Sequence, residues 1–484
     1  MPASDTSIVI LAAGKGTRLK SDLAKVLHRA GGRPLLETVI RTCRPLKAAQ
    51  TLVVVGHQAG EVGALAESLD AQTVLQNPQR GTGHAMQVAR RAVRKSAKLA
   101  VVLPGDAPLL RTETLAALID THRRGEAAAT ILSAELADPG SYGRIVRDAE
   151  GRVLAIVESD ALTPEQRAIR EVNSAIYCFT LEKLWPCLAA LRPENVHREL
   201  YLTDAIAMLR TRNERVLAQI ADDANEVLGC NTRADLAGAD RVLRSRKAAQ
   251  LMDAGVTIYY PETVAIDPEV TAGPDTVIEA GVQLLGDTRI GARCTIRTGC
   301  VLHNTRVDDA AVVGPHTNAI DSRIGAGAHV GPFARLRPGA DIRAHAHVGN
   351  FVEIKKSVIH EGAKAQHLSY LGDATVGPGT NVGAGTITCN YDGVAKHETK
   401  IGKGVFIGSD TALVAPVRVG DGAYVAAGSV ITENVPADAL AIARGRQVNK
   451  PGWAKARKKQ LAATKKPEKP AKRRRARPKA RRRR

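Results

Sequence analysis

VIEAGVQLLGDTRIGARCTIRTGCVL, residues 277–302, carries an aliphatic residue at every sixth position. The same period returns after residue 324 and again after residue 401, and glycine often follows the aliphatic residue. Six residues per side, with one buried aliphatic residue in each and glycine at tight corners, are typical of a triangular parallel β-helix. A β-sandwich with glycine-rich turns is the alternative. Because each coil is buried only by its neighbours, we expect residues 255–456 to form one domain.

The first half of the chain has a different pattern. From residue 8 to about 230, short apolar runs such as Ile8–Leu11 alternate with longer amphipathic segments. This alternation predicts a Rossmann-like α/β domain with a mostly parallel sheet over residues 1–233. Residues 235–252 are rich in helix formers and carry an apolar stripe, which predicts a linker helix over residues 234–254.

The positive charge is concentrated at the C-terminus. Residues 450–484 hold 18 of the 69 Lys and Arg residues and one of the 49 acidic residues, which leaves 51 basic and 48 acidic groups, a net charge of +3 out of +20, on residues 1–449. Residues 457–484 are therefore expected to be a disordered basic tail. Such a tail favours nonspecific contacts with anionic partners, and a nucleic-acid-binding or anionic-surface-binding protein is the alternative from another class.

Cysteine spacing and hydropathy indicate in which cellular compartment the protein acts. The seven cysteines form no C-x-x-C pair, which argues against a disulfide framework and a zinc site. No apolar run approaches the roughly 20 residues of a membrane-spanning helix. The residues before the first apolar run carry neither a basic n-region nor a small-residue cleavage site, so we expect no secretion. We expect a cytoplasmic protein without a membrane contact.

A glycine-rich segment, Leu11–Leu19 (LAAGKGTRL), follows the first apolar run, and Lys25 comes shortly after it. A structural turn or a dinucleotide-binding loop would be the ordinary interpretation of this segment, but Leu19 stands where the third glycine of G-x-G-x-x-G belongs. The segment resembles the signature of sugar-nucleotide pyrophosphorylases, in which backbone N–H groups meet a nucleoside triphosphate while Arg18 and Lys25 neutralise its phosphates.

Further residues, in order and at near-constant spacing, resemble the N-acetylglucosamine-1-phosphate uridyltransferase/glucosamine-1-phosphate acetyltransferase family. The resemblance implies a uridyltransferase that uses UTP and Mg²⁺, with Arg18 and Lys25 stabilising the transition state and Asp106 and Asn231 as oxygen ligands of the metal. The nucleotide and the amino sugar would bind to Leu11, Ala12, Ala13, Gly14, Lys25, Gln76, Gly81, Thr82, Pro104, Gly105, Asp106, Gly143, Glu158, Asn173 and Asn231. By this resemblance, Gln76, Gly81 and Thr82 would read the uracil edge, and Gly143, Glu158 and Asn173 would hold the amino sugar.

Two positions depart from the family's pattern. Ala24 precedes Lys25 where the wider signature usually has proline, and Pro104 stands where related enzymes often have tyrosine before Gly105-Asp106. Neither change removes a charge or a ligand. The first puts the approach of Lys25 in doubt, and the second puts one sugar or ribose contact in doubt.

Polar segments that interrupt the repeats carry the resemblance to the acetyltransferase half of the family, whose repeats form a left-handed parallel β-helix. The resemblance implies that His367 is the general base, since a histidine titrating near neutrality suits the removal of a proton from an ammonium. We expect Glu353 to orient it. Glucosamine 1-phosphate would bind to Arg337, Lys355, Tyr370 and Asn381, and acetyl-CoA to Ala384, Asn390, Tyr391, Lys396, Ser409, Ala427 and Arg444.

Three further expectations follow from these motifs. Cys389 is interpreted as a small packing residue, with a nucleophile as the alternative, because a thioester donor needs no enzyme-bound acyl group. The resemblance implies a homotrimer with acetyl-CoA sites between adjacent β-helices. The alternative enzyme is a uridyltransferase whose repeat domain is inert.

Overall fold

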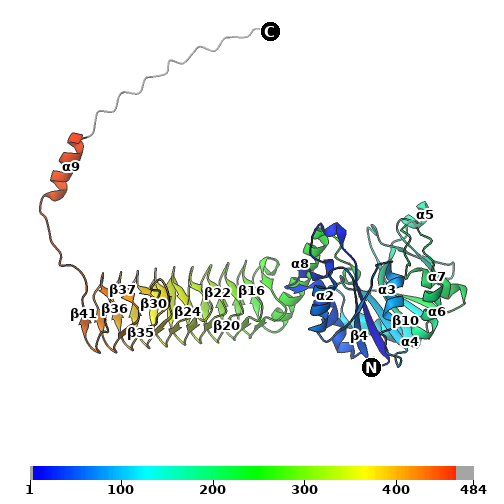
Figure 1. The fold of residues 1–484 in the computed structure, drawn as a ribbon, viewed down its shortest axis with the longest axis horizontal. Coiled ribbons are helices and arrows are strands. Elements are labelled where there is room, and N and C mark those ends of the chain that lie inside the picture. Colours follow the sequence, from blue (N-terminus) through cyan, green and yellow to red (C-terminus); the bar gives the residue numbers. More distant parts are fainter. Residues whose placement is uncertain (1–3, 196, 465–484) are drawn as a thin grey trace, which may run out of the picture.

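The structure is a computed structural model that describes residues 4–195 and 197–464. An α/β domain comes first and a long, narrow stack of short strands follows it (Figure 1). Among the described residues, no helix is long and apolar enough to cross a membrane.

The central sheet of the α/β domain is mostly parallel. Its strand order is β11 (Val216–Ile220), β7 (Ala129–Glu135), β10 (Glu171–Thr180), β6 (Leu99–Pro104), β1 (Thr6–Ala12), β4 (Gln50–Val55) and β5 (Gln72–Leu75). Only β10 runs antiparallel to its neighbours in this order, and the hairpin of β8 (Arg144–Arg147) and β9 (Val153–Val157) joins the sheet through β10. Because β4 and β6 flank β1 on opposite sides, the connections diverge at the carboxyl end of β1, where ligands bind in open α/β sheets.

Alternating side chains of β1 explain why helices cover both faces of this sheet. Ile8 and Ile10 are fully buried against one set of helices, whereas Val9, which points the other way, is fully buried against the other set. The first set is α1 (Leu35–Cys43), α2 (Ala59–Glu67) and α4 (Thr112–Arg124). The second set is α3 (Thr82–Ala89), α6 (Leu181–Ala190) and α7 (Asp204–Thr211). A short helix, α5 (Pro164–Arg167), lies outside both sets.

A single long helix, α8 (Arg233–Asp253), connects the two regions. It begins with a capping box, in which the Thr232 side chain accepts a hydrogen bond from the backbone of Asp235 and the Asp235 side chain accepts one from the backbone of Thr232. Its buried residues, including Ala239 and Leu251, pack against the α/β domain near its beginning and against the first coil of the repeats near its end.

The repeat region is a three-sided parallel β-helix, as the six-residue period predicts. The first face runs from β12 (Thr257–Ile258) to β41 (Leu440–Ala441), the second from β13 (Ala265–Ile266) to β40 (Val430–Ile431), and the third from β14 (Thr271–Ala272) to β38 (Val417–Val419). Neighbouring strands on each face are parallel and in register, so that Ile278 lies against Ile296. Both isoleucines are fully buried, because the interior of each coil is covered only by the coils above and below it.

The end of the chain corrects one prediction. Helix α9 spans Trp453–Thr464, so the expectation of disorder from residue 457 is wrong for residues 457–464. Alanine, lysine, arginine, glutamine and leucine make up most of this helix, and their high intrinsic helix propensity does not require burial. No residue of α9 is buried. The rest of the expected tail, residues 465–484, lies outside the described residues.

Candidate active sites

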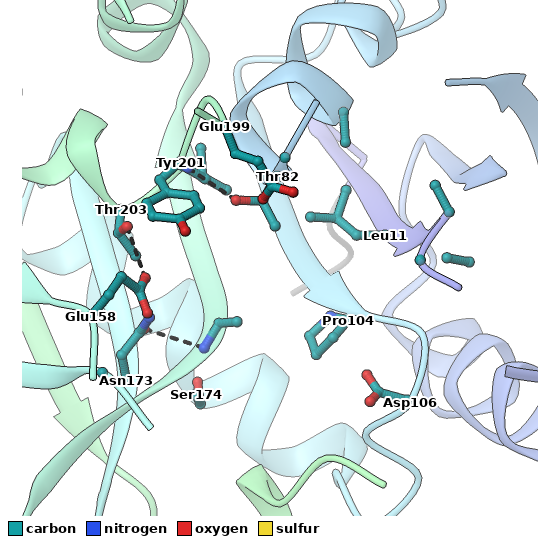
Figure 2. A pocket seen from close by; sticks show the side chains of 18 of the residues that line it. Leu11, Thr82, Pro104, Asp106, Glu158, Asn173, Ser174, Glu199, Tyr201 and Thr203 are labelled. Carbon is teal, nitrogen blue, oxygen red and sulfur yellow. Dashed lines mark hydrogen bonds between the residues drawn. The ribbon is translucent and has the colours of Figure 1, made fainter. Parts of the chain in front are cut away.

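A cavity of about 530 Å³ opens at the carboxyl ends of β1 and β6 (Figure 2). Leu11 of β1 pairs in register with Pro104 of β6, which places both residues at the mouth of the switch point in the sheet. Arg18, Gly105 and Asn231 do not line the cavity. The other residues predicted for the first site line it together: Leu11, Ala12, Ala13, Gly14, Lys25, Gln76, Gly81, Thr82, Pro104, Asp106, Gly143, Glu158 and Asn173.

The glycine-rich loop folds closely over Lys25. Gly16 has a φ of 65°, in the left-handed region, and a Cβ added to it would lie 2.5 Å from the Lys25 Cβ. Only glycine satisfies both conditions. Lys25 itself begins a short 3-10 helix, Lys25–Leu27, and its side chain extends to the cavity.

Two cationic side chains and two side-chain oxygen atoms meet beside the cavity. The Lys25 Nζ lies 2.5 Å from Asp106 Oδ2 and 3.1 Å from Asn231 Oδ1, while Arg18 donates to the same Asn231 oxygen at 2.9 Å. One ammonium thus touches both oxygens that were predicted as metal ligands, although Arg18 and Asn231 stand outside the cavity itself. The oxygens of a carboxylate and a carboxamide converge on one point, and that donor chemistry fits a hard divalent cation.

The segment predicted to read the uracil edge is rigidly held. The Gln76 Nε2 donates to the Gly81 carbonyl oxygen at 2.9 Å. Gly81 has a φ of 94°, and a Cβ on it would lie 2.6 Å from the Leu200 carbonyl oxygen, so no other residue fits here. The Thr82 hydroxyl accepts a hydrogen bond from the Leu202 N–H at 3.0 Å. The first turn of α3 is therefore tied to the loop opposite it, which precedes α7.

Polar groups predicted for the amino sugar gather on the opposite wall, where Figure 2 shows Thr203, Glu158 and Asn173 below Tyr201. The Thr203 hydroxyl donates to Glu158 Oε1 at 3.0 Å, and Asn173 Oδ1 accepts from the Ala175 N–H at 3.2 Å. Burial, reinforced by nearby acidic side chains, raises the pKa of the Glu158 carboxyl, although the Thr203 hydrogen bond works against this shift. The Glu158 carboxylate is thus a desolvated acceptor that gains from a hydroxyl donor on a ligand.

Sequence reasoning missed one stretch of this wall. Glu199, Tyr201 and Thr203 all line the cavity, and burial together with neighbouring carboxylates raises the pKa of Tyr201 to about 12. The alternation of these polar residues with Leu200 and Leu202 was the available signal, although the residues form no strand and Leu202 also lines the cavity. The stretch carries no motif.

The register of the β-helix places the predicted acetyl-transfer residues in a column. Asn350 of β27 (His347–Asn350) pairs with His367 of β30 (Lys364–His367). The next coils are in the same register, with Lys364 against Asn381, Asn381 against Phe406, and Phe406 against Tyr424. His347, Lys364, Asn381, Phe406 and Tyr424 thus lie above one another on successive coils. The residue three places after each of them stands at the corner that ends the first face. We call this line the corner column: Asn350, His367, Ala384, Ser409 and Ala427.

His367 has a different partner from the one expected. Its Nδ1 lies 3.1 Å from Asn350 Oδ1. Glu353 instead accepts a hydrogen bond from Arg337 at 2.9 Å, so the prediction that Glu353 orients His367 is wrong. Glu353 stands on the second face, whereas Asn350 lies directly against His367 across two coils of the first face, and register decides which side chain is within reach.

The remaining predicted residues lie mainly on the second face. Arg337 follows β25 (Arg335–Leu336) of that face, Lys355 ends its β28 (Glu353–Lys355), and Tyr370 begins its β31 (Tyr370–Gly372). A loop over residues 390–398 interrupts the coil next to them, and the Lys355 ammonium lowers the pKa of Lys396 in this loop. Two cations held this close together form a site for a dianion.

Within this loop and at the end of the corner column, hydrogen bonds hold three of the predicted acetyl-CoA residues. The Asn390 side chain donates to Asp373 Oδ2 at 2.5 Å, and the Tyr391 hydroxyl donates to the Gly393 carbonyl oxygen at 2.6 Å. Arg444 donates to the Ala427 carbonyl oxygen at 3.0 Å, which brings it to the column.

One predicted residue is separated from its group. Asn381 belongs to β33 (Asn381–Val382) on the first face, whereas Arg337, Lys355 and Tyr370 are on the second. In the described part of the chain, the second cavity of about 560 Å³ lies elsewhere, around Arg289 on the third face. Neither of these two cavities is lined by Arg337, Lys355, Tyr370 or Asn381.

Comparisons with known proteins agree with both halves of the fold. Residues 8–200 match the family described as MobA-like NTP transferase domain, and residues 398–433 match bacterial transferase hexapeptide (six repeats). A protein named Bifunctional protein GlmU from Koribacter versatilis is 50% identical over 452 residues, which cover 93% of this chain and 96% of that protein.

Two further relatives of the same name show similar coverage. The protein from Sorangium cellulosum is 48% identical over 464 residues, 94% of this chain and 98% of the relative. The protein from Pelobacter propionicus is 45% identical over 450 residues, 93% of this chain and 98% of the relative. Similarity of this extent spans the α/β domain, α8 and the β-helix together.

Proposed function

The chain belongs to the family of bifunctional GlmU proteins, and we propose that its two activities are divided between the cavity of the α/β domain and the corner column of the β-helix. The chain is an enzyme of UDP-N-acetylglucosamine synthesis, with a glucosamine-1-phosphate acetyltransferase and a uridyltransferase activity. Its substrates are small molecules. The observation that carries the assignment of the first site is the convergence of Lys25, Asp106 and Asn231 at the edge of the cavity.

In the first site, UTP and N-acetylglucosamine 1-phosphate would lie at the carboxyl ends of β1 and β6. Gln76 and Thr82 hold the uracil, and Glu158 and Asn173 hold the sugar on the opposite wall. A phosphate oxygen of the sugar attacks the α-phosphorus of UTP, a new P–O bond forms, and the bond to pyrophosphate breaks. Arg18 and Lys25 stabilise the negative charge that develops on the phosphoryl oxygens. No covalent enzyme intermediate is needed.

Nucleotidyl transfer of this kind uses a divalent metal ion, and we propose Mg²⁺. Asp106 and Asn231 would hold it, since their oxygens lie within contact of one Lys25 ammonium. When bound, the metal supplies positive charge next to the triphosphate oxygens. With Asp106 and Asn231 holding the metal, Lys25 would be available to contact phosphate.

In the second site, His367 would take a proton from the ammonium of glucosamine 1-phosphate. The amine nitrogen attacks the thioester carbon of acetyl-CoA, a C–N bond forms and the C–S bond breaks. The second proton leaves as the amide forms, and the departing coenzyme A thiolate takes up a proton. Asn350 holds the imidazole in place through its contact with Nδ1. Lys355 and Lys396 would neutralise phosphate groups of the two substrates.

We propose that the acetyl-transfer site is complete only in a homotrimer. Asn381 and Lys355 are both assigned to glucosamine 1-phosphate, yet they lie on different faces of one copy. In a ring of three parallel β-helices, each copy presents its first face to a different face of its neighbour, so the two side chains can meet across the boundary.

The free cysteines of the described residues, together with the absence of a C-x-x-C pair, support a reducing cytoplasm as the place of action.

Subunit mixing tests this proposal. Asn381→Ala and Lys355→Ala are each expected to abolish acetyl transfer when alone. Unfolding them together and refolding the mixture should restore a fraction of the activity, because some boundaries then carry both wild-type side chains. Uridylyl transfer, which is contained within one copy, should stay unchanged throughout. Mixtures as inactive as their components would contradict the shared site.

A further inference from the structure

We propose that Gln58 is a positioning residue for Lys25, and that it replaces the stiffness that a proline at position 24 would give. The proposal rests on the proposed role of Lys25 in uridylyl transfer. Gln58 does not line the cavity, and it lies more than 30 residues away from Lys25 in the sequence. Its side chain nevertheless bonds the segment that leads into Lys25.

Both ends of the Gln58 amide are used. Its Oε1 accepts a hydrogen bond from the Ala24 N–H at 2.5 Å, and its Nε2 donates to the Asp22 carbonyl oxygen at 3.0 Å. The side chain thus closes a bridge over the backbone of residues 22–24. Ala24 is only 1% exposed, so its N–H would lack a water partner without Gln58.

The backbone of Gln58 is in an unfavourable conformation. It has φ 47° and ψ 47°, in the left-handed region, at the residue that precedes α2. A Cβ is sterically unfavourable in this region, and glycine is the usual occupant. The side chain does not cap α2. The two hydrogen bonds to the loop are what glutamine provides here and glycine would not.

The conformation of Ala24 explains what those bonds replace. Ala24 has φ −54° and ψ 137°, and this φ lies within the range that a proline ring imposes. A proline at position 24 would hold the entry to Lys25 through its ring, without a hydrogen bond. The φ torsion of an alanine is not fixed by a ring, so at position 24 the two hydrogen bonds of Gln58 restrain the backbone instead. Lys25 follows directly, with its ammonium at Asp106 and Asn231.

This reasoning predicts that positions 24 and 58 are coupled with a definite sign. Gln58→Gly relieves the unfavourable backbone conformation at position 58 but removes both hydrogen bonds to residues 22–24. The kcat of uridylyl transfer should therefore fall about tenfold, the loss expected for one or two positioning hydrogen bonds. Ala24→Pro alone should also be harmful, because the ring occupies the space of the bridge and leaves Oε1 unpaired. The double variant should recover to within about twofold of wild type.

The test measures both activities of the full chain for the wild type, the two single variants and the double variant. The expected result is a loss in uridylyl kcat with little change in KM and no change in acetyl transfer. The unfolding midpoint of Gln58→Gly should change little, because relief of the positive φ offsets the loss of the partner of the Ala24 N–H. A purely structural role would lower that midpoint.

Lys25→Ala serves as the reference that separates this proposal from the assignment of the site. If Lys25→Ala abolishes uridylyl transfer while Gln58→Gly leaves it intact, the bridge has no positioning role and the inference is wrong. If Ala24→Pro is equally harmful with glutamine or glycine at position 58, the coupling is absent and the inference is likewise wrong. If Lys25→Ala itself is active, the proposed site fails, whatever Gln58 does.

Discussion

The Lys25 ammonium lies 2.5 Å from the Asp106 carboxylate, and both side chains are largely shielded from water, with 20% and 10% of their surfaces exposed. Asn231 Oδ1 lies 3.1 Å from the same ammonium. Three segments that are far apart in the sequence are thereby joined at the edge of one cavity. A group that carries both a cation and phosphate oxygens can exchange partners with this cluster, releasing Lys25 toward phosphate.

Lys25→Ala should lower uridylyl kcat by about 10²- to 10³-fold, the loss typical of removing one preorganised donor to a developing charge. Acetyl transfer by the same preparation should be unchanged. Lys95→Ala, which removes an exposed lysine of the same domain, is the matched control. Steady-state assays of both half-reactions provide the measurement. A uridylyl rate within threefold of wild type would exclude Lys25 from the transition state.

The contact between Asn350 and His367 makes a prediction about pH. Asn350→Ala removes the acceptor for Nδ1 and should lower acetyl-transfer kcat by about tenfold, with little change in KM. Asn350→Asp keeps an acceptor and adds a negative charge, which favours the imidazolium form. The pH at half-maximal acetyl transfer should therefore move upward in Asn350→Asp. Profiles that coincide with wild type would show that Asn350 does not act through His367.

His122 gives the α/β domain a component of acid sensitivity. Burial, with a smaller contribution from Arg123, lowers the pKa of His122 from 6.5 to about 4, and Thr130 and Thr180 bond its two ring nitrogens. Since the pKa is lowered on folding, the stability that the neutral ring provides is present above about pH 6.5 and is lost as pH falls toward 4. The loss is on the order of 3 kcal/mol.

Urea unfolding followed by Trp185 fluorescence, at several pH values from 7 to 4, tests this account. His122→Asn should be less stable than wild type at pH 7, and its stability should fall less steeply with pH. His303→Asn, in the β-helix, is the control and should keep the slope of wild type. Equal slopes for His122→Asn and wild type would show that His122 does not titrate in this range.

The C-terminal segment is predicted to be dispensable for both reactions. Helix α9 has no buried residue, and Figure 1 shows it away from the β-helix. Truncation after residue 456 should leave both rates within about twofold, while retention on a polyanionic resin at low salt should fall, because 16 Lys and Arg residues are removed with residues 457–484. Loss of acetyl transfer would place the segment in the active site, and unchanged retention would show that its charge binds no polyanion.

Periodicity and motif order predicted the architecture and most of the first cavity. The six-residue period follows directly from the geometry of the β-helix, because one aliphatic residue is buried on each side of every coil. The lining of the first cavity follows from residues at strand ends, such as Leu11 and Pro104, which register brings together. Both the repeat architecture and the strand-end residues depend on short-range sequence patterns, which can be recognised without the structure.

Contacts between side chains were harder to predict. Gln58 and Thr203 carry no motif, and their roles depend on which distant backbone or carboxylate comes within 3 Å in the fold. The assignment of Glu353 to His367 was wrong because proximity along the chain does not determine which residue lies opposite on the next coil. Helix α9 was missed because charge was weighed more heavily than helix propensity.

The most direct test of two independent sites is a product analysis with one enzyme preparation and two variants. Wild type supplied with glucosamine 1-phosphate, acetyl-CoA, UTP and Mg²⁺ should form UDP-N-acetylglucosamine. His367→Ala should form it only when N-acetylglucosamine 1-phosphate is supplied, and Asp106→Ala should stop at N-acetylglucosamine 1-phosphate. If His367→Ala still consumes acetyl-CoA at the wild-type rate, or if either variant loses both reactions while folded, the division of the two activities between these sites is contradicted.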